Sequence, residues 1–176
     1  MFLGEPMNTE KIINFKMPRY NELPAIELYV DQVLKYVELT FAPLEIYSKE
    51  RALTNAMVNN YVKQGVVPRP VKKRYSRVHI AYLMIAYLSK QIFTIDEIAQ
   101  MIKVQNSCFD IETTNNYMCD ELENILRCIF TGKTPSQDST KTNAPQRFFV
   151  RSTLIAFANK IYVQELLQEY AKDTEE

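Results

Sequence analysis

The sequence predicts a mainly α-helical fold, and two observations carry this prediction. Only 3 of the 176 residues are glycine, whereas hairpin-rich β folds need many residues that can adopt positive φ. Several segments instead repeat apolar residues at the three- and four-residue spacing of a helix that buries one face. With 47% apolar and 24% charged residues, the chain has the composition of a globular protein with a proper core.

The N-terminal part is expected to hold an arm and one long helix. Residues 1–23 show little periodicity, although the loose alternation in 11–17 is compatible with an edge strand. A helix is predicted from about Pro24 to Phe41, because proline is tolerated in a first turn and an apolar stripe follows it. The stripe consists of Ile26, Tyr29, Val30, Val33 and Val37.

A short helix is predicted between Thr54 and Gly65. The threonine hydroxyl can cap the first turn, and glycine commonly ends a helix. One side of this helix is apolar, with Tyr61 at its middle and therefore expected in the core. The apolar side holds Met57, Val58, Tyr61 and Val62, and the polar side holds Asn55, Ala56, Asn59, Asn60 and Lys63.

The rest of the chain predicts one irregular segment and four helices. Residues 66–75 contain two prolines and are expected to form a short β hairpin or a loop. Ser76 is expected to cap the next helix, and Thr94 with Glu97 forms a capping box for the one after it. The predicted helices span about 77–90, 94–103, 113–130 and 146–171.

Charge is balanced overall but separated along the chain. Residues 51–95 hold eight basic and no acidic residues, which leaves thirteen basic against twenty-one acidic residues elsewhere, a net charge of −8. Such a separation favours a polyanionic partner, and the alternative is a solvated basic surface without a ligand. The basic residues are Arg51, Lys63, Arg69, Lys72, Lys73, Arg74, Arg77 and Lys90.

Motifs for catalysis, cofactors and membranes are absent from the sequence. Cys108, Cys119 and Cys128 lack the paired spacing of a zinc site or a disulfide framework, so they are expected to be buried, reduced thiols. The single histidine, His79, lies among apolar residues and is expected to be a hydrogen-bonded helix residue. Without a phosphate-binding loop or a nucleophile–base pair, neither an enzyme nor a cofactor is expected. The lack of an apolar run of membrane length or a signal-like N-terminus predicts a cytoplasmic protein.

Residues 54–103 resemble the winged helix-turn-helix of MerR-type regulators. The shared order is a capped helix, a glycine turn, a proline, a basic extended stretch, a Tyr-Ser pair and a further helix. The matching residues are Thr54, Tyr61, Gly65, Pro68, Arg74, Tyr75 and Ser76. Two features depart from that pattern: Ala56 and Asn59 occupy positions that usually carry arginine, and a dozen residues separate Phe41 from Thr54 where three or four are usual.

A longer stretch, about 15–170, resembles the bacterial family catalogued as domain of unknown function 1836. The matching segments are LP at 23–24, LYVDQV at 28–33, VNNYVK at 58–63 and KKRYS at 72–76. That family is described as MerR-like by fold, and its biochemical role is not established. The resemblance therefore implies a mainly α, MerR-like winged helix-turn-helix with a short β wing and C-terminal helices.

These features predict a DNA-binding transcriptional regulator. Asparagine can pair with adenine in the major groove, and basic side chains bind phosphates. The alternative is a protein-interaction or small-ligand-sensing module that kept this fold without binding DNA, and no effector is identified. The candidate DNA-binding residues are Thr54, Asn55, Asn59, Asn60, Lys63, Arg69, Lys72, Lys73, Arg74 and Arg77.

The chain is predicted to comprise an arm (1–23), a winged helix-turn-helix domain (24–103) and a helical extension (104–176). Its last helix is apolar on two sides, one of which can cover the domain. The other side is expected to form a homodimer. The first side holds Val150, Leu154, Phe157 and Ile161, and the second holds Phe148, Ile155, Tyr162, Leu166, Leu167 and Tyr170.

Overall fold

The computed structural model describes residues 9–44, 53–135 and 145–173. Its α-helices are α1 (Thr9–Ile13), α2 (Val30–Phe41), α3 (Asn55–Lys63), α4 (Arg77–Ser89), α5 (Ile95–Asn106), α6 (Ile111–Phe130) and α7 (Pro145–Asp173), and the 3-10 turns are η1 (Tyr20–Glu22) and η2 (Ala42–Leu44). The mainly helical fold is therefore confirmed. Within these described ranges, strand pairing is limited to two isolated antiparallel bridges, Leu28 with Tyr75 and Val71 with Arg74, and no sheet forms.

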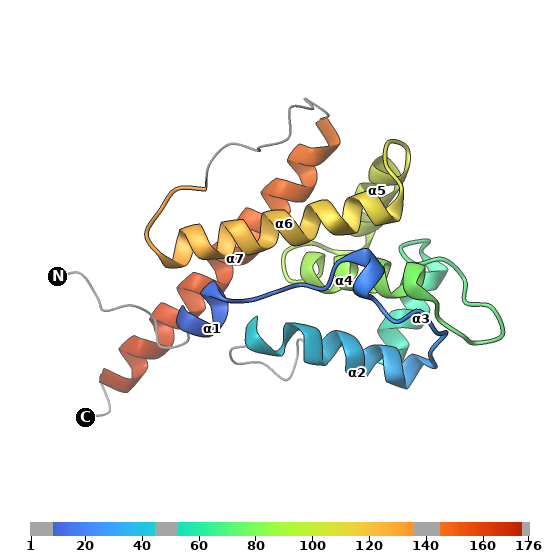
Figure 1. Cartoon of the computed structure of the whole chain (residues 1–176), viewed down its shortest axis with the longest axis horizontal. Coiled ribbons are helices and arrows are strands. Elements are labelled where there is room, and N and C mark those ends of the chain that lie inside the picture. The colour runs from blue at the N-terminus through green and yellow to red at the C-terminus, as the bar shows by residue number, and fades with distance from the viewer. Residues whose placement is uncertain (1–8, 45–52, 136–144, 174–176) are drawn as a thin grey trace.

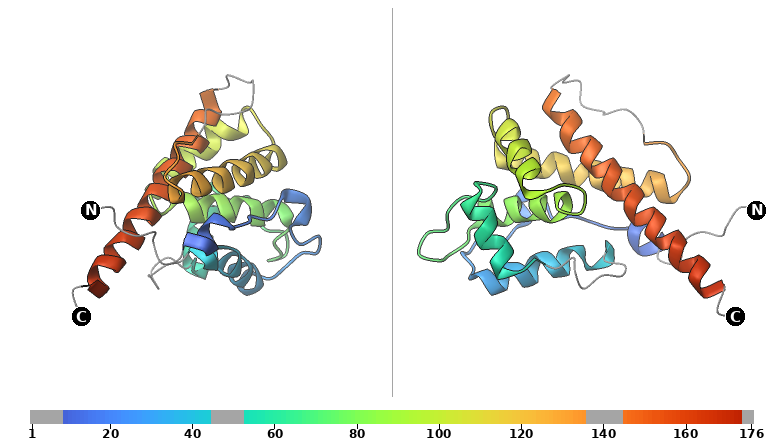
Figure 2. Two further views of the ribbon diagram at one scale, coloured as in Figure 1. Left: turned by 60° about the vertical axis from the view of Figure 1, so that its left-hand side comes forward. Right: turned by 180° about the vertical axis from the view of Figure 1, so that it is seen from behind.

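Helix α4 is the centre of the packing. Ile80, Leu83 and Met84 are fully buried, as expected for a helix that is apolar on nearly all sides. Helices α6 and α7 pack on each other and on α4, whereas α2 packs against α4 from the other side (Figure 1). The long helix α7 crosses this body diagonally, and its C-terminal end extends beyond the other helices (Figure 2).

The N-terminal segment differs from the predicted edge strand. Thr9–Ile13 is helical, and the chain after it runs along α6 with Phe15 and Met17 buried. A helix surface offers no strand edge, so the backbone amides of this segment bond to side chains of α6. The Met17 amide donates to Glu123 Oε1 over 3.2 Å, and the Tyr20 amide donates to Asn116 Oδ1 over 2.9 Å. The alternating apolar residues therefore mark an extended segment without a partner strand.

Helix α2 begins at Val30, six residues later than predicted. Leu28 instead exchanges two backbone hydrogen bonds with Tyr75, of 2.9 and 2.8 Å, and a helical backbone could not make them. Ile26 at the start of the predicted stripe is consequently 72% exposed. The later part of the stripe is confirmed, because Val33 and Val37 are buried and α2 ends at Phe41 as predicted.

The remaining helices lie close to their predicted positions. The capping box of α5 is present, with Thr94 and Glu97 bonded reciprocally. Helix α6 starts two residues early because the Asp110 carboxylate accepts from the Thr113 amide over 2.7 Å. Residues 131–145 lack large apolar side chains and are rich in Ser, Thr and Pro, which predicts a loop, and most of them lie outside the described residues. None of the described helices is both long enough and apolar enough to cross a bilayer.

One continuous hydrophobic core draws on all three predicted parts of the chain. It includes Ile12 from the arm, Val37 and Leu83 from the central part, and Leu122 and Ile161 from the C-terminal part. The inward side of α7 is as predicted, with Leu154, Phe157 and Ile161 buried and Val150 half-buried. The boundaries between the three parts stay a prediction.

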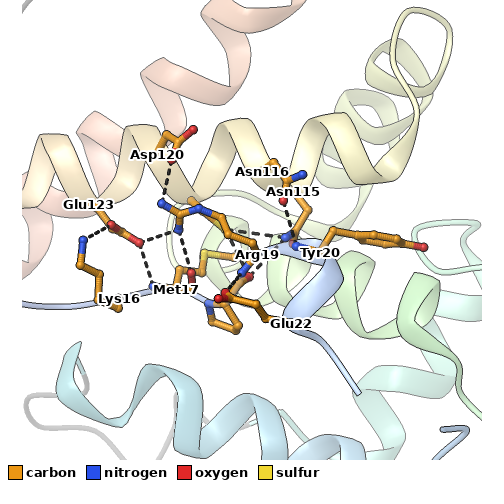
Figure 3. Close-up of polar contacts among 11 residues, drawn as sticks. Lys16, Met17, Arg19, Tyr20, Glu22, Asn115, Asn116, Asp120 and Glu123 are labelled. Carbon is orange, nitrogen blue, oxygen red and sulfur yellow. Dashed lines mark hydrogen bonds and ion pairs between the residues drawn. The ribbon is translucent and has the colours of Figure 1, made fainter. Parts of the chain in front are cut away.

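A buried carboxylate joins the N-terminal arm to α6 (Figure 3). Glu123 is 5% exposed and accepts from Lys16 Nζ and Arg19 Nη1, each over 2.6 Å, as well as from the Met17 amide. Arg19 also donates to Asp120 over 2.7 Å. Burial alone would raise the pKa of Glu123, but the hydrogen bonds from Arg19, Lys16 and Met17 outweigh it and lower that pKa.

The cysteines differ in burial, and all are free thiols. Cys119 is buried beside Arg19, and burial raises the pKa of its thiol to about 12. Cys128 is half-buried, whereas Cys108 is exposed, contrary to the prediction that all are buried. Cys108 is exposed because it lies in the short connection between α5 and α6, outside the core.

Candidate nucleic-acid interface

Helix α3 presents one buried and one exposed side, as predicted. Val58 and Tyr61 are buried, and burial raises the pKa of Tyr61. Thr54 is exposed, and its Oγ1 accepts from the Met57 amide over 3.2 Å, so its hydroxyl already caps the helix. The exposed side consists of Asn55, Ala56, Asn59, Asn60 and Lys63.

Gly65 ends α3 and redirects the chain. Its φ of +74° is a left-handed conformation that glycine adopts readily. The Gly65 amide donates to Val62 O over 3.2 Å and the Val66 amide donates to Tyr61 O over 2.9 Å, which is the Schellman pattern. Val66 and Val67 are then buried, so the basic segment that follows begins from a fixed point of the core.

A tight turn places two lysines at the tip of the segment 66–75. The Arg74 amide donates to Val71 O over 2.8 Å, and the two central residues have positive φ, 48° at Lys72 and 60° at Lys73. This is the geometry of a type I′ turn, which usually holds Asn-Gly. Both lysines are exposed. The sequence therefore keeps two charges in a conformation that lysine disfavours.

Arg74 and Arg77 are held against the N-terminal part of the chain. The Arg74 guanidinium lies over the Tyr29 ring, 3.7 Å from its centroid. Arg77 Nε donates to Leu23 O over 3.2 Å. Both side chains are half-buried, unlike the exposed Lys63 and Arg69. Sequence reasoning grouped all these cations together, but two of them also have a structural role.

His79 holds the two ends of the basic segment together. Its Nδ1 accepts from the Ser76 amide over 3.0 Å, which leaves Nε2 to donate to Arg69 O over 3.3 Å. Its ring also meets Tyr75 edge to face. The predicted role of a hydrogen-bonded helix histidine is confirmed.

The exposed cations and amides gather at one end of the molecule. Helix α3 and the 66–75 segment lie together there, remote from the C-terminal end of α7 (Figure 1). Across the described residues, no carboxylate lies within ion-pair distance of Lys63, Arg69, Lys72 or Lys73. Their positive charge is thus not neutralised by the described part of the chain. The ten predicted residues are carried by α3 and its N-cap, the segment after it and the first turn of α4.

Comparison with known proteins places the chain in a family. The model of the family described as "Domain of unknown function (DUF1836)" matches residues 18–126. The chain belongs to this family. The DUF1836 region covers α2 to α5, most of α6 and the ten candidate residues, as well as Arg19 and Glu123. Neither the curated proteins nor the solved structures give a match.

Proposed function

We propose that this DUF1836 protein binds duplex DNA through α3 and the basic segment 66–77, as a winged helix-turn-helix transcriptional regulator. The observation that carries the proposal is the joint exposure of three asparagines and four cations at one end of the molecule. These are Asn55, Asn59, Asn60, Lys63, Arg69, Lys72 and Lys73. They lie in a 45-residue stretch, 51–95, without a single carboxylate.

Helix α3 is the proposed reading element. An α-helix fits the major groove, where an asparagine can bond bidentately to N6 and N7 of adenine. Asn59 lies midway along the exposed side and has no internal hydrogen-bond partner for its side chain among the described residues. Its side chain is exposed and can therefore reach a base edge.

The turn at Lys72 and Lys73 is the proposed phosphate-binding wing. Phosphate contacts supply most of the affinity of such proteins, and they position the helix on the duplex. The backbone pair between Leu28 and Tyr75 and the bonds of His79 fix the base of the wing. The Thr54 hydroxyl oxygen caps α3, and we propose that it keeps this role in the complex. Its neighbour Asn55 is then the proposed DNA contact at this end of α3.

Asn59→Ala is expected to lower the preference for a selected duplex over a scrambled one by about 1–3 kcal/mol, the contribution of one base contact. No charge is removed, so the dependence of affinity on salt should stay unchanged. Equilibrium titrations of both duplexes over a salt series measure both quantities. Asn159→Ala, an exposed asparagine on α7, serves as the control. Unchanged site preference in Asn59→Ala would show that this residue does not read a base.

The C-terminal half of α7 is the proposed homodimer contact. Val163, Leu167 and Tyr170 are at least half exposed there, on the end of α7 that extends beyond the body (Figure 2). Of the predicted second side, Ile155, Tyr162 and Leu166 are half-buried within one chain. A helix-turn-helix dimer reads half-sites about 34 Å apart, so a dimer implies a near-palindromic site.

Leu167→Glu is expected to convert the dimer into a monomer, because it places a charge in the contact between two apolar stripes. Sedimentation equilibrium of the wild type and the variant measures this, with circular dichroism to show that the helices are intact. Phe148→Glu, a similarly exposed residue at the other end of α7, is the control and should stay dimeric. A wild type that is monomeric at tens of micromolar would reject the proposed contact.

A further inference from the structure

A groove lies between α5 and the N-terminal half of α7. Its volume is about 660 Å³, and its walls are mostly apolar. Phe148 and Phe149 are 63% and 52% exposed, and Val104 on the facing helix is 39% exposed. Pockets for small molecules commonly measure roughly 300–1,000 Å³ and are lined by aromatic and aliphatic side chains with a few polar groups.

The groove adjoins a second, smaller cavity that reaches the core. This partly open, mostly apolar cavity of about 40 Å³ lies between α4, α5, α6 and α7. Met101, Phe149 and Thr153 line both spaces. Methionine is unbranched and adapts its shape easily, so a ligand that moves the side chains of Met101 and Phe149 gains the inner space as well. A ligand that touched only the rim of the groove would not occupy the inner cavity.

The one charged side chain among the described lining residues is acidic and disfavours anionic ligands. Among the described residues that line the groove, Glu97 alone is charged. Its carboxylate accepts from the Thr94 amide and hydroxyl, each over 2.8 Å, and these bonds lower the pKa of Glu97. The carboxylate therefore stays ionised and fixed at the rim. Gln100 and Ser152 add neutral, exposed hydrogen-bonding groups.

We propose that the α5–α7 groove binds an uncharged, largely apolar small molecule that inserts between Phe148, Phe149 and Met101. Gln100 and Ser152 are the hydrogen-bonding partners for a polar group at its outer end. The volume, the apolar lining and the acidic rim carry this proposal, and it does not depend on DNA binding by α3.

The test is a fluorescence titration of the full chain with Nile red, which is uncharged, and with anilinonaphthalene sulfonate, which is anionic. We expect one Nile red per chain and much weaker binding of the anionic dye. Ser152→Trp should fill the groove and Phe148→Ala should remove one wall, and each should weaken Nile red binding by about tenfold or more. Both residues are exposed, so the fold should persist, which thermal unfolding checks.

Leu39→Ala is the matched control, since Leu39 on α2 is 62% exposed and lies outside the groove. It should leave dye binding unchanged. Equal loss in Leu39→Ala, or equal affinity for the anionic dye, would overturn the proposal. So would a Ser152→Trp variant that changes self-association in sedimentation while it keeps the dye, because the groove would then be a contact between copies of the chain.

Discussion

Replacing Lys72 with Asn and Lys73 with Gly is expected to weaken binding to every duplex while keeping or raising the stability of the fold. Asn-Gly is the preferred pair for a type I′ turn, so it relieves the positive φ of both lysines. If each lysine contacts one phosphate, the slope of log affinity against log salt should flatten by about 1.8 for each bound protomer, or about 0.9 for each contact. Titration of a random-sequence duplex over a salt series measures the slope.

A charge-matched control separates this effect from a general loss of positive charge. Lys11 lies on α1 and Lys133 follows the C-terminal end of α6, and both are exposed. Helix α1 and that end of α6 lie on the side of the molecule opposite α3 (Figure 1). Replacing both with Gln removes the same two charges and should leave the slope unchanged. If the Lys72 and Lys73 variant keeps the parental slope, or if the control flattens it equally, the turn is not the phosphate contact.

Glu123→Gln is expected to destabilise the fold by about 2 kcal/mol. Removal of one partner of a buried ion pair costs roughly 3–5 kcal/mol, but Lys16 is 70% exposed and Arg19 retains Asp120, so the loss should be smaller. Denaturant unfolding measures it. Asp120→Asn, which changes a 70% exposed partner of the same guanidinium, should cost less than about 1 kcal/mol. Equal losses in the two variants would show that burial of Glu123 adds nothing.

The contribution of Glu123 to the free energy of unfolding is expected to depend on pH. The pKa of Glu123 is lower in the folded state than in the unfolded state, so its contribution is fully present above the unfolded pKa of about 4.3. It is lost as the pH falls through the folded pKa. The stability difference between wild type and Glu123→Gln should therefore be constant near pH 7 and shrink as the solution is acidified below about pH 4. A difference that grows on acidification would contradict this origin.

The local signals of the candidate site could be predicted from the sequence. Thr54 and Gly65 lie at the ends of α3 because capping and positive φ depend on neighbouring residues alone. The two sides of α3 follow from helical periodicity, and Tyr61 is buried as expected.

Contacts between distant segments could not be predicted. The residues around Leu28 contain no signal for its backbone pair with Tyr75. That pair, rather than helix propensity, determines where α2 begins. The stacking of Arg74 on Tyr29 is also a contact between distant segments. The sequence predicts Arg74 only as a DNA-binding residue, but its side chain also contributes to the packing of the fold.

Two further features were missed because their sequence signals are weak or misleading. The turn at Lys72 and Lys73 lacks the usual Asn-Gly signature. Glu123 lies on a long amphipathic helix, where a carboxylate normally faces solvent, and only the arrival of Lys16 and Arg19 from a segment about a hundred residues earlier accounts for its burial.

The salt dependence of wild-type binding to a random-sequence duplex tests the DNA-binding proposal most directly. Lys63, Arg69, Lys72 and Lys73 are the exposed cations of the candidate interface. Four phosphate contacts per protomer predict a slope of about −3.6 for one bound protomer, and about −7.2 for the proposed homodimer, between roughly 50 and 200 mM salt. A slope near zero, or no binding at the lowest salt, would contradict the account and favour a protein-interaction or ligand-sensing role for this DUF1836 fold.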